Sequence, residues 1–273
     1  MPDLPDLFGA FTGGWLGKEI LAPTTKAVGE QMRDNLANVA RHWARLLRGG
    51  RPADGAIPLK LVKAAYDVGA VCEDELSASY IGGVLASSQS GIDRDDRAAN
   101  LLALLGRLSI YQIRTHYIFY AAAQQVLANT ETDLRYKFER VVNAQFYLPG
   151  RVWRDAMEMT KGESEQWKAI RTHVMHGMRR EHLIEQGYTY ASPTVLRRFT
   201  STRADFPEPG FFFTLSPLGI ELFSSAHGFY IDPFESFLSP SIEFAHDGIA
   251  IKAGCATVSS LPLLPEEDPQ TGQ

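Results

Sequence analysis

The sequence predicts a mostly α-helical protein, in which an N-terminal helical bundle precedes a small α+β module and an acidic C-terminal tail. Three observations support this fold class. Apolar residues recur at three- and four-residue spacing through most of residues 15–149. Short β-type runs occur after the helix-breaking pair Pro149-Gly150, which we take as the domain boundary. Residues 229–273 are rich in proline and acidic residues, and we expect their end to be disordered.

The composition is that of an ordinary globular protein. The chain has 273 residues, of which 45% are hydrophobic and 22% are charged, enough for one large or two small domains. No stretch approaches the roughly 20 apolar residues that span a bilayer. Cys72 lies in an apolar helix pattern far from Cys255, so we expect a buried free thiol. We therefore expect a cytoplasmic protein, although the apolar segment Leu7–Leu21 permits contact with a membrane surface.

Residues 1–14 predict an irregular lead, and the bundle follows. Apolar positions predict a helix that ends at Gly49-Gly50. Ile57–Ser88 then reads as two helices joined by an acidic turn. Along the second helix runs a strip of small side chains: Ser79, Gly82, Gly83 and Ala86. Because glycine in a helix costs about 1 kcal/mol relative to alanine, we expect a neighbouring helix packed very close to this strip.

Two further helices complete the predicted bundle. One runs to about Leu105, where Gly106 stops it. Serine followed three residues later by glutamine, at Ser109 and Gln112, has the spacing of a capping box and starts the next helix. That helix is dense in aromatic residues, for which we expect burial.

The predicted α+β module covers residues 150–228. Helices are expected from Arg151 to about Lys161 and from Glu163 through Gln186, where Gly187 ends the second one. Short strands are expected at Tyr188–Ala191, Val195–Thr200 and Phe211–Leu215. Ser216-Pro217 is a strong helix start, so a helix follows from Leu218 to Ala226. This order of helix, hairpin and helix resembles a winged helix, and the resemblance implies DNA binding.

Charge is distributed unevenly along the chain, whose net charge is −5. Residues 1–150 have a net charge of 0, residues 151–203 of +4 and residues 204–273 of −9. A basic middle before an acidic tail permits either a nucleic-acid face or neutralisation of that face by the tail. The basic residues that would bind nucleic acid are Arg179, Arg180, Arg197 and Arg198.

A family resemblance is visible in three segments: WLGKEILAPTTKAVGEQM, the stretch from IPLKLV to DELSASYIGGVLASS, and FTLSPLGIELF. They resemble the abortive-infection alpha group of bacterial proteins and cover roughly Trp15 to Phe223, discontinuously. The chain departs from the group's pattern in the second helix of the hairpin, at Tyr80 and the glycine pair. The resemblance implies an antiphage defence protein that acts through protein or membrane contacts.

The most specific catalytic candidate is the pair Arg171 and His176. It resembles the Arg-x4-His signature of HEPN ribonucleases, which occur in bacterial defence systems. Arginine would stabilise phosphate charge and histidine would move the proton of the 2′-hydroxyl. Against this hypothesis, roughly one arginine–histidine pair at such a spacing is expected by chance in a chain with 19 arginines and 7 histidines.

Other constellations predict no chemistry. His173, His176 and His182 do not share one helix face, so we expect no metal site. The chain has no phosphate-binding glycine loop and no nucleophile elbow, and we expect no cofactor. The favoured hypothesis is therefore a non-enzymatic antiphage protein with a protein partner or self-association. A sensor or regulator that binds nucleic acid or protein through the winged-helix-like module, and a HEPN-like ribonuclease, remain as alternatives.

Overall fold

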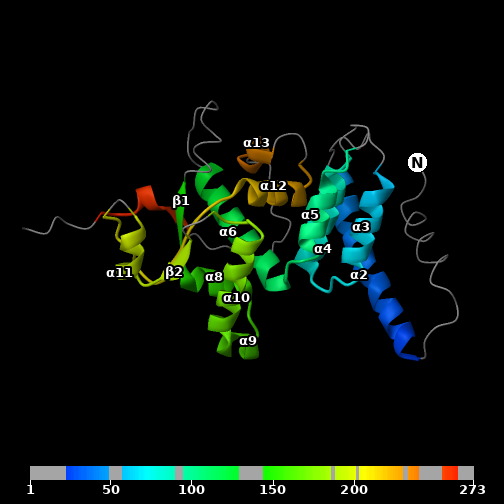
Figure 1. Cartoon of the computed structure of the whole chain (residues 1–273), viewed down its shortest axis with the longest axis horizontal. Coiled ribbons are helices and arrows are strands. Elements are labelled where there is room, and N and C mark those ends of the chain that lie inside the picture. The colour runs from blue at the N-terminus through cyan, green and yellow to red at the C-terminus, as the bar shows by residue number, and fades with distance from the viewer. Residues whose placement is uncertain are drawn as a thin grey trace, which may run out of the picture.

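The computed structural model describes residues 23–48, 57–89, 95–128, 144–185, 188–200, 203–229, 233–239 and 254–263. These residues are mostly helical, with one four-stranded antiparallel sheet, which confirms the predicted mostly-α class (Figure 1). The expected irregular lead at residues 1–14 lies outside the described residues. Within the described ranges, none of the helices is long and apolar enough to cross a membrane.

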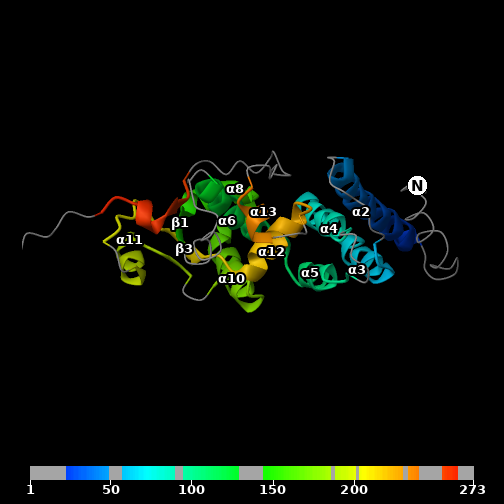
Figure 2. The ribbon, with the colours of Figure 1, turned by 90° about the horizontal axis from the view of Figure 1, so that it is seen from above.

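The molecule is elongated, with the first helices at one end and the sheet near the other (Figures 1 and 2). The first helices are α2 (Pro23–Arg48), α3 (Leu59–Gly69), α4 (Glu75–Ser87) and α5 (Ala98–Leu105). Helices α3 and α4 form the predicted hairpin. The side chain of Asp74 caps α4 by accepting a hydrogen bond from the Ser77 N–H at 2.9 Å.

Helix α4 is buried along almost its whole length, from Leu76 to Ser87. Its two glycines face two different neighbours. A Cβ atom on Gly82 would lie 2.8 Å from the carbonyl oxygen of Val39 on α2, and one on Gly83 would lie 1.8 Å from the carbonyl oxygen of Ala226. The predicted close helix packing is therefore confirmed, and it occurs on two sides.

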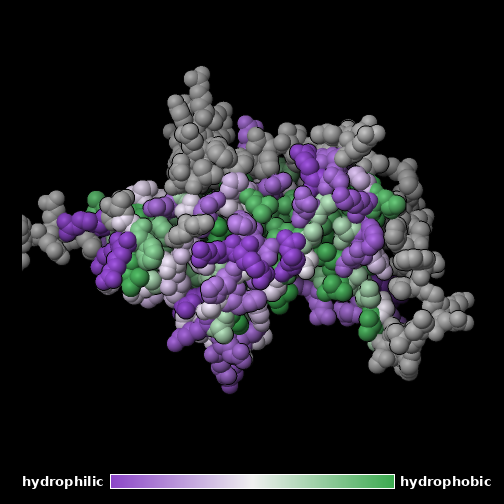
Figure 3. All heavy atoms as spheres, in the orientation of Figure 1, coloured by the Kyte–Doolittle hydropathy of each residue, from purple (hydrophilic) through white to green (hydrophobic). Residues whose placement is uncertain are grey.

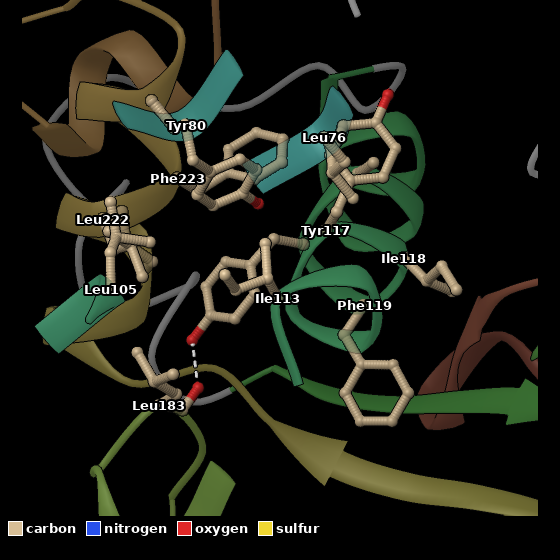
Figure 4. Packing of buried hydrophobic residues seen from close by; sticks show 14 of the residues in the cluster. Leu76, Tyr80, Leu105, Ile113, Tyr117, Ile118, Phe119, Leu183, Leu222 and Phe223 are labelled. Carbon is tan, nitrogen blue, oxygen red and sulfur yellow. Dashed lines mark hydrogen bonds between the residues drawn. The ribbon is translucent and has the colours of Figure 1, made fainter. Parts of the chain in front are cut away.

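Helix α6 (Ile110–Ala128) runs through the middle of the molecule. The predicted capping box starts it, since the Ser109 N–H donates to Gln112 Oε1 at 2.9 Å and the Gln112 N–H donates to Ser109 Oγ at 3.4 Å. Most of its aromatic side chains are fully buried, namely Tyr117, Phe119 and Tyr120. Figure 4 shows how its side chains meet Tyr80 of α4 and Phe223 of α12.

The sheet has the strand order β2-β3-β1-β4. The strands are β1 (Gln145–Pro149), β2 (Thr189–Ala191), β3 (Gly210–Thr214) and β4 (Ala256–Thr257). In the central pair, Phe146 lies opposite Phe213 and Tyr147 lies opposite Phe212. Alternate residues face opposite sides. Phe146 and Phe213 join the main core, whereas Tyr147 and Phe212 join a small second cluster with Leu196, Phe206 and Val258.

The remaining elements surround the sheet and α6. They are α8 (Gly150–Met157), α9 (Lys161–Glu165), α10 (Trp167–Arg180), α11 (Pro193–Leu196), η2 (Arg197–Phe199), α12 (Pro217–Ala226), α13 (Pro233–Phe237) and η3 (Val258–Ser260). Ser216 caps α12 as predicted, by accepting a hydrogen bond from the Gly219 N–H at 3.0 Å.

Two predictions about this part are wrong. Residues 195–200 were expected to form a strand, but 195–199 belong to α11 and η2. The reason is Ser192-Pro193, a helix start of the same kind as Ser216-Pro217. The helix expected from Glu163 through Gln186 is interrupted at Gln166 and ends at Arg180. It ends there because His182 adopts a left-handed conformation with φ 54°, after which Ile184 forms a β-bridge with Leu215.

One hydrophobic cluster extends across the expected boundary at Pro149-Gly150, from Val39 on α2 to Phe237 on α13. Strand β1 precedes that boundary but pairs with β3, which follows it. Parts of the expected tail also enter the fold, because β4 pairs with β1. The hydrophobic core is therefore shared by the segments before and after Pro149-Gly150.

Candidate functional site

Helix α10 carries basic side chains and no carboxylate between its first and last residues. Its sequence WKAIRTHVMHGMRR holds lysine, arginine and histidine but neither aspartate nor glutamate. The helix is anchored by an apolar stripe that includes Val174 and Met178, both fully buried. The basic side chains therefore lie on the outer faces. In Figure 3, which has the orientation of Figure 1, the surface in the region of α9 and α10 is largely hydrophilic.

A groove of about 430 Å³ lies between α10 and β2. It is lined by Arg171, Thr172, Met175, His176, Arg179, Tyr188, Thr189 and Tyr190. None of these residues is acidic, and two are arginines. We call this feature the α10–β2 groove. Its lining combines positive charge, aromatic rings and hydroxyl groups.

Aromatic rings hold the guanidinium group of Arg171. Its central carbon lies 4.2 Å from the ring centre of Tyr190 and 5.0 Å from that of Trp167. The guanidinium carbon of Arg154 lies 5.3 Å from the same Trp167 ring. Tyr190 is in turn supported by the ring of Phe211 at 4.8 Å. Such cation–π contacts each contribute about 0.5–2 kcal/mol, so the Arg171 side chain is held in one position over the sheet edge.

The two arginines of this groove lack the carboxylate partners that several other arginines of the chain have. Elsewhere Arg107 pairs with Glu181 at 3.0 Å, and Arg197 pairs with Asp205 at 3.0 Å. Within the described ranges, neither Arg171 nor Arg179 forms an ion pair. Their charges are therefore not neutralised locally, and the α10–β2 groove attracts anions.

The structure brings together three of the six site residues predicted from the sequence: Arg171, His176 and Arg179. It separates the others from them. Arg180 pairs with Glu181 at 2.9 Å, whereas Arg197 and Arg198 lie on η2 and do not line the groove.

The sequence did not single out the residues that hold Arg171. From the sequence, Trp167 falls within the helix expected from Glu163, and Tyr190 within the short strand expected at Tyr188–Ala191. A basic residue four positions after a tryptophan is a signal for a stacked pair on a helix, but the contribution of Tyr190 depends on how the sheet packs.

His173 lies outside the α10–β2 groove, where its Nε2 atom is 3.0 Å from Ser109 Oγ. Among the residues that the structure describes, no three or more potential ligand side chains gather into a metal site. The thiol of Cys72 is a poor nucleophile because burial raises its pKa to about 11, and burial raises the pKa of Cys255 to about 12.

A second polar cluster is buried and has a structural role. His116 on α6 lies 3.0 Å from the Gly219 carbonyl oxygen and 2.9 Å from the Tyr80 hydroxyl. A carbonyl only accepts, so His116 Nε2 donates to it and Nδ1 accepts from Tyr80. Burial lowers the pKa of His116 to about 3, which keeps the ring neutral. The ring therefore joins α4, α6 and α12.

Comparison of this chain with family models, curated proteins and solved structures gives no match. The geometry of the α10–β2 groove is therefore the main basis for a functional proposal.

Proposed function

We propose that this protein binds nucleic acid through helix α10 and the α10–β2 groove. The observation that carries the proposal is the acid-free groove, in which Arg171 and Arg179 have no ion-pair partner among the described residues. Phosphates are the anions that arginine forks bind with the best geometry. The aromatic and hydroxyl lining provides contacts for bases and sugars.

The order of the elements supports a winged-helix-like arrangement for this part of the chain. Strand β1 is followed by α8, α9, α10 and β2, and β3 follows after α11 and η2. In the sheet β3 lies between β2 and β1, and β4 lies on the other side of β1. A winged helix has the same strand order. In helix-turn-helix proteins the second helix of the pair contacts the nucleic acid, and by this fold-level analogy α10 is the contact helix.

The test is binding of labelled single-stranded and duplex oligonucleotides, followed by fluorescence anisotropy over a range of salt concentrations. For a single strand, each lost phosphate contact reduces the slope of log affinity against log salt by about 0.7. A variant with both Arg171→Ala and Arg179→Ala should therefore bind more weakly, with a slope reduced by about 1.4. Arg180→Ala is the control on the same helix, because Arg180 lies outside the groove lining and contacts Glu181, which it shares with Arg107.

Two results would contradict this proposal. One is that the unmodified protein shows no salt-dependent binding to either kind of oligonucleotide. The other is that the double variant keeps the affinity and the salt slope of the Arg180→Ala control.

RNA cleavage is a second candidate function, because Arg171 and His176 line the same groove. Arginine would stabilise the charge on the phosphorus oxygens, and the imidazole would take the 2′-hydroxyl proton. Incubation of RNA with the protein should then yield fragments, and Arg171→Ala or His176→Ala should abolish them. His173→Ala should leave cleavage intact. Equal cleavage in all variants would exclude this site.

For the cellular role we propose antiphage defence of the abortive-infection alpha type. Helix α4 of the second family-like segment packs on α12, the helix that begins in the third segment, because Gly83 abuts Ala226 at the end of α12. This contact supports a shared core for those segments. Bacteria that express the protein should resist phage at a low phage-to-cell ratio and collapse at a high ratio. Unchanged phage growth at both ratios, across several phages, would remove this role.

A further inference from the structure

The guanidinium group of Arg171 is arranged as a binding group with a fixed direction. Its central carbon lies 4.2 Å from the ring centre of Tyr190 and 5.0 Å from that of Trp167, and these two rings stand at 69° to each other. The two rings fix the guanidinium from two sides, and its planar N–H donors serve a ligand on the remaining side. Among the described residues, no hydrogen-bond acceptor takes these donors. The side chain therefore presents a pre-organised fork for a ligand with two acceptor oxygens.

The α10–β2 groove is a concavity open to solvent. Its volume of about 430 Å³ is comparable with that of small-molecule sites, which is about 300–1,000 Å³. A base pair inside a duplex stays in its stack and cannot enter a concavity between a helix and a strand. An unpaired nucleotide can turn out of its strand and enter such a site.

The charges in the groove extend beyond the Arg171 fork. Arg179 lies eight residues further along α10, which is about 12 Å along the helix axis. His176 lies between them. This length accommodates a nucleotide together with the phosphates on both of its sides. At the sheet edge, Tyr188, Thr189 and Tyr190 supply rings and hydroxyl groups beside these charges.

We propose that the α10–β2 groove is a site for one unpaired nucleotide, whose phosphate binds the free edge of the Arg171 guanidinium. Trp167 and Tyr190 are positioning residues, because they hold the Arg171 guanidinium in place and do not themselves contact the phosphate. The inference rests on the proposed nucleic-acid binding and specifies that the groove recognises a single unpaired nucleotide. The nucleotide can be free or part of a single strand, since the phosphate and base chemistry is the same.

The first experiment compares ligands on the full chain. A labelled single-stranded oligonucleotide is bound and then displaced by adenosine 5′-monophosphate, adenosine, inorganic phosphate or the duplex of the same sequence. We expect the single strand to bind at least about tenfold more tightly than the duplex, a difference of about 1.4 kcal/mol. The monophosphate should displace it at lower concentration than adenosine or phosphate alone. If the monophosphate displaces the labelled strand, a free nucleotide is sufficient as a ligand of the groove. If only another single strand displaces it, the ligand is a nucleotide within a strand.

The second experiment separates the phosphate contact from its positioning. Arg171→Ala should weaken single-strand binding by about tenfold or more and reduce the salt slope by about 0.7. Arg171→Lys keeps the charge but cannot reproduce the planar fork, so it should weaken binding and retain the salt slope. Tyr190→Leu should weaken binding by about threefold to thirtyfold with an unchanged slope. Tyr190→Phe should restore affinity, because it keeps the ring.

The inference is overturned if duplex and single strand bind equally well, or if Arg171→Lys and Tyr190→Leu bind like the unmodified protein. In that case nucleic-acid binding by the outer face of α10 would still stand. If no oligonucleotide binds at all, both the proposed function and this inference fail.

Discussion

Substitution of Gly83 by alanine tests the packing at the centre of the fold. In an exposed helix this change would stabilise the protein by about 1 kcal/mol, because alanine has the higher helix propensity. Here the new Cβ atom would lie 1.8 Å from the Ala226 carbonyl oxygen and 2.3 Å from its carbon. These are backbone atoms of another helix, so α12 would have to move away from α4.

The expected loss follows from this overlap. Inserting a methyl group into a closely packed core costs about 1–3 kcal/mol and sometimes more, and the neighbour here cannot rotate away. We expect Gly83→Ala to lower the free energy of unfolding by about 2 kcal/mol after its propensity gain. In a protein of this size, such a loss lowers the melting temperature by roughly 4–8 °C.

Two other glycines provide a graded comparison. A Cβ atom on Gly82 would lie 2.8 Å from the Val39 carbonyl oxygen, so Gly82→Ala should also destabilise, but less than Gly83→Ala. Gly29 on α2 is exposed and has no atom within 4 Å of its added Cβ, so Gly29→Ala should raise stability by up to about 1 kcal/mol.

The assay is thermal and denaturant unfolding of the three variants beside the parent, followed by circular dichroism. The order of stability should be Gly29→Ala, parent, Gly82→Ala, Gly83→Ala. A Gly83→Ala protein as stable as the parent would refute the packing argument.

Three further predictions concern buried polar groups. The folded-state pKa of His116 is about 3 and its ordinary value is 6.5, so the unfolded chain binds more protons between these values. The free energy of unfolding should therefore fall as pH drops from 6.5 towards 3, by up to about 1.4 kcal/mol per pH unit from this residue. Denaturant unfolding of His116→Gln should show a correspondingly smaller pH dependence, and an identical dependence would contradict the neutral ring. The hydroxyl of Tyr120 donates to the Leu183 carbonyl at 2.7 Å and accepts from the Ser216 N–H at 3.0 Å. In the same assay, Tyr120→Phe should therefore lower the free energy of unfolding by about 1–3 kcal/mol for each of these two groups that is left without a hydrogen bond. Unchanged stability would mean that water replaces the hydroxyl. The Cys72 thiol, with a pKa of about 11, is ionised to only about one part in a thousand at pH 8, so iodoacetamide should alkylate it far more slowly than a free thiol. Alkylation at the rate of free cysteine would contradict the raised pKa of this half-buried thiol.

The sequence predicted the local signals of the fold well. The cap at Ser216, the capping box at Ser109 and the end of α5 at Gly106 all depend on residues a few positions apart, and each is present in the structure. The glycine pair of α4 also predicted close packing, because two glycines in a buried helix need a physical reason.

Long-range features could not be predicted in this way. The end of α10 at Arg180 depends on a left-handed His182 and on a bridge from Ile184 to a distant strand, although the residues themselves continue a helical pattern. Likewise, the sequence could pair Arg171 with His176 by their spacing, but the stacking of Arg171 on Tyr190 arises only because β2 pairs with β3 beside α10.

The position of the candidate site depends on a residue that the sequence identified for another reason. Gln112 caps α6, and its Oε1 atom accepts a hydrogen bond from the Ser109 N–H at 2.9 Å. The same side chain fills the space over Gly177, where a Cβ atom would lie 1.7 Å from Gln112 Nε2. Because the cap holds the glutamine, α10 can approach α6 this closely only with glycine at that position. A capping residue thereby sets the distance of α10 from the core, and with it the place where Arg171 meets the edge of the sheet.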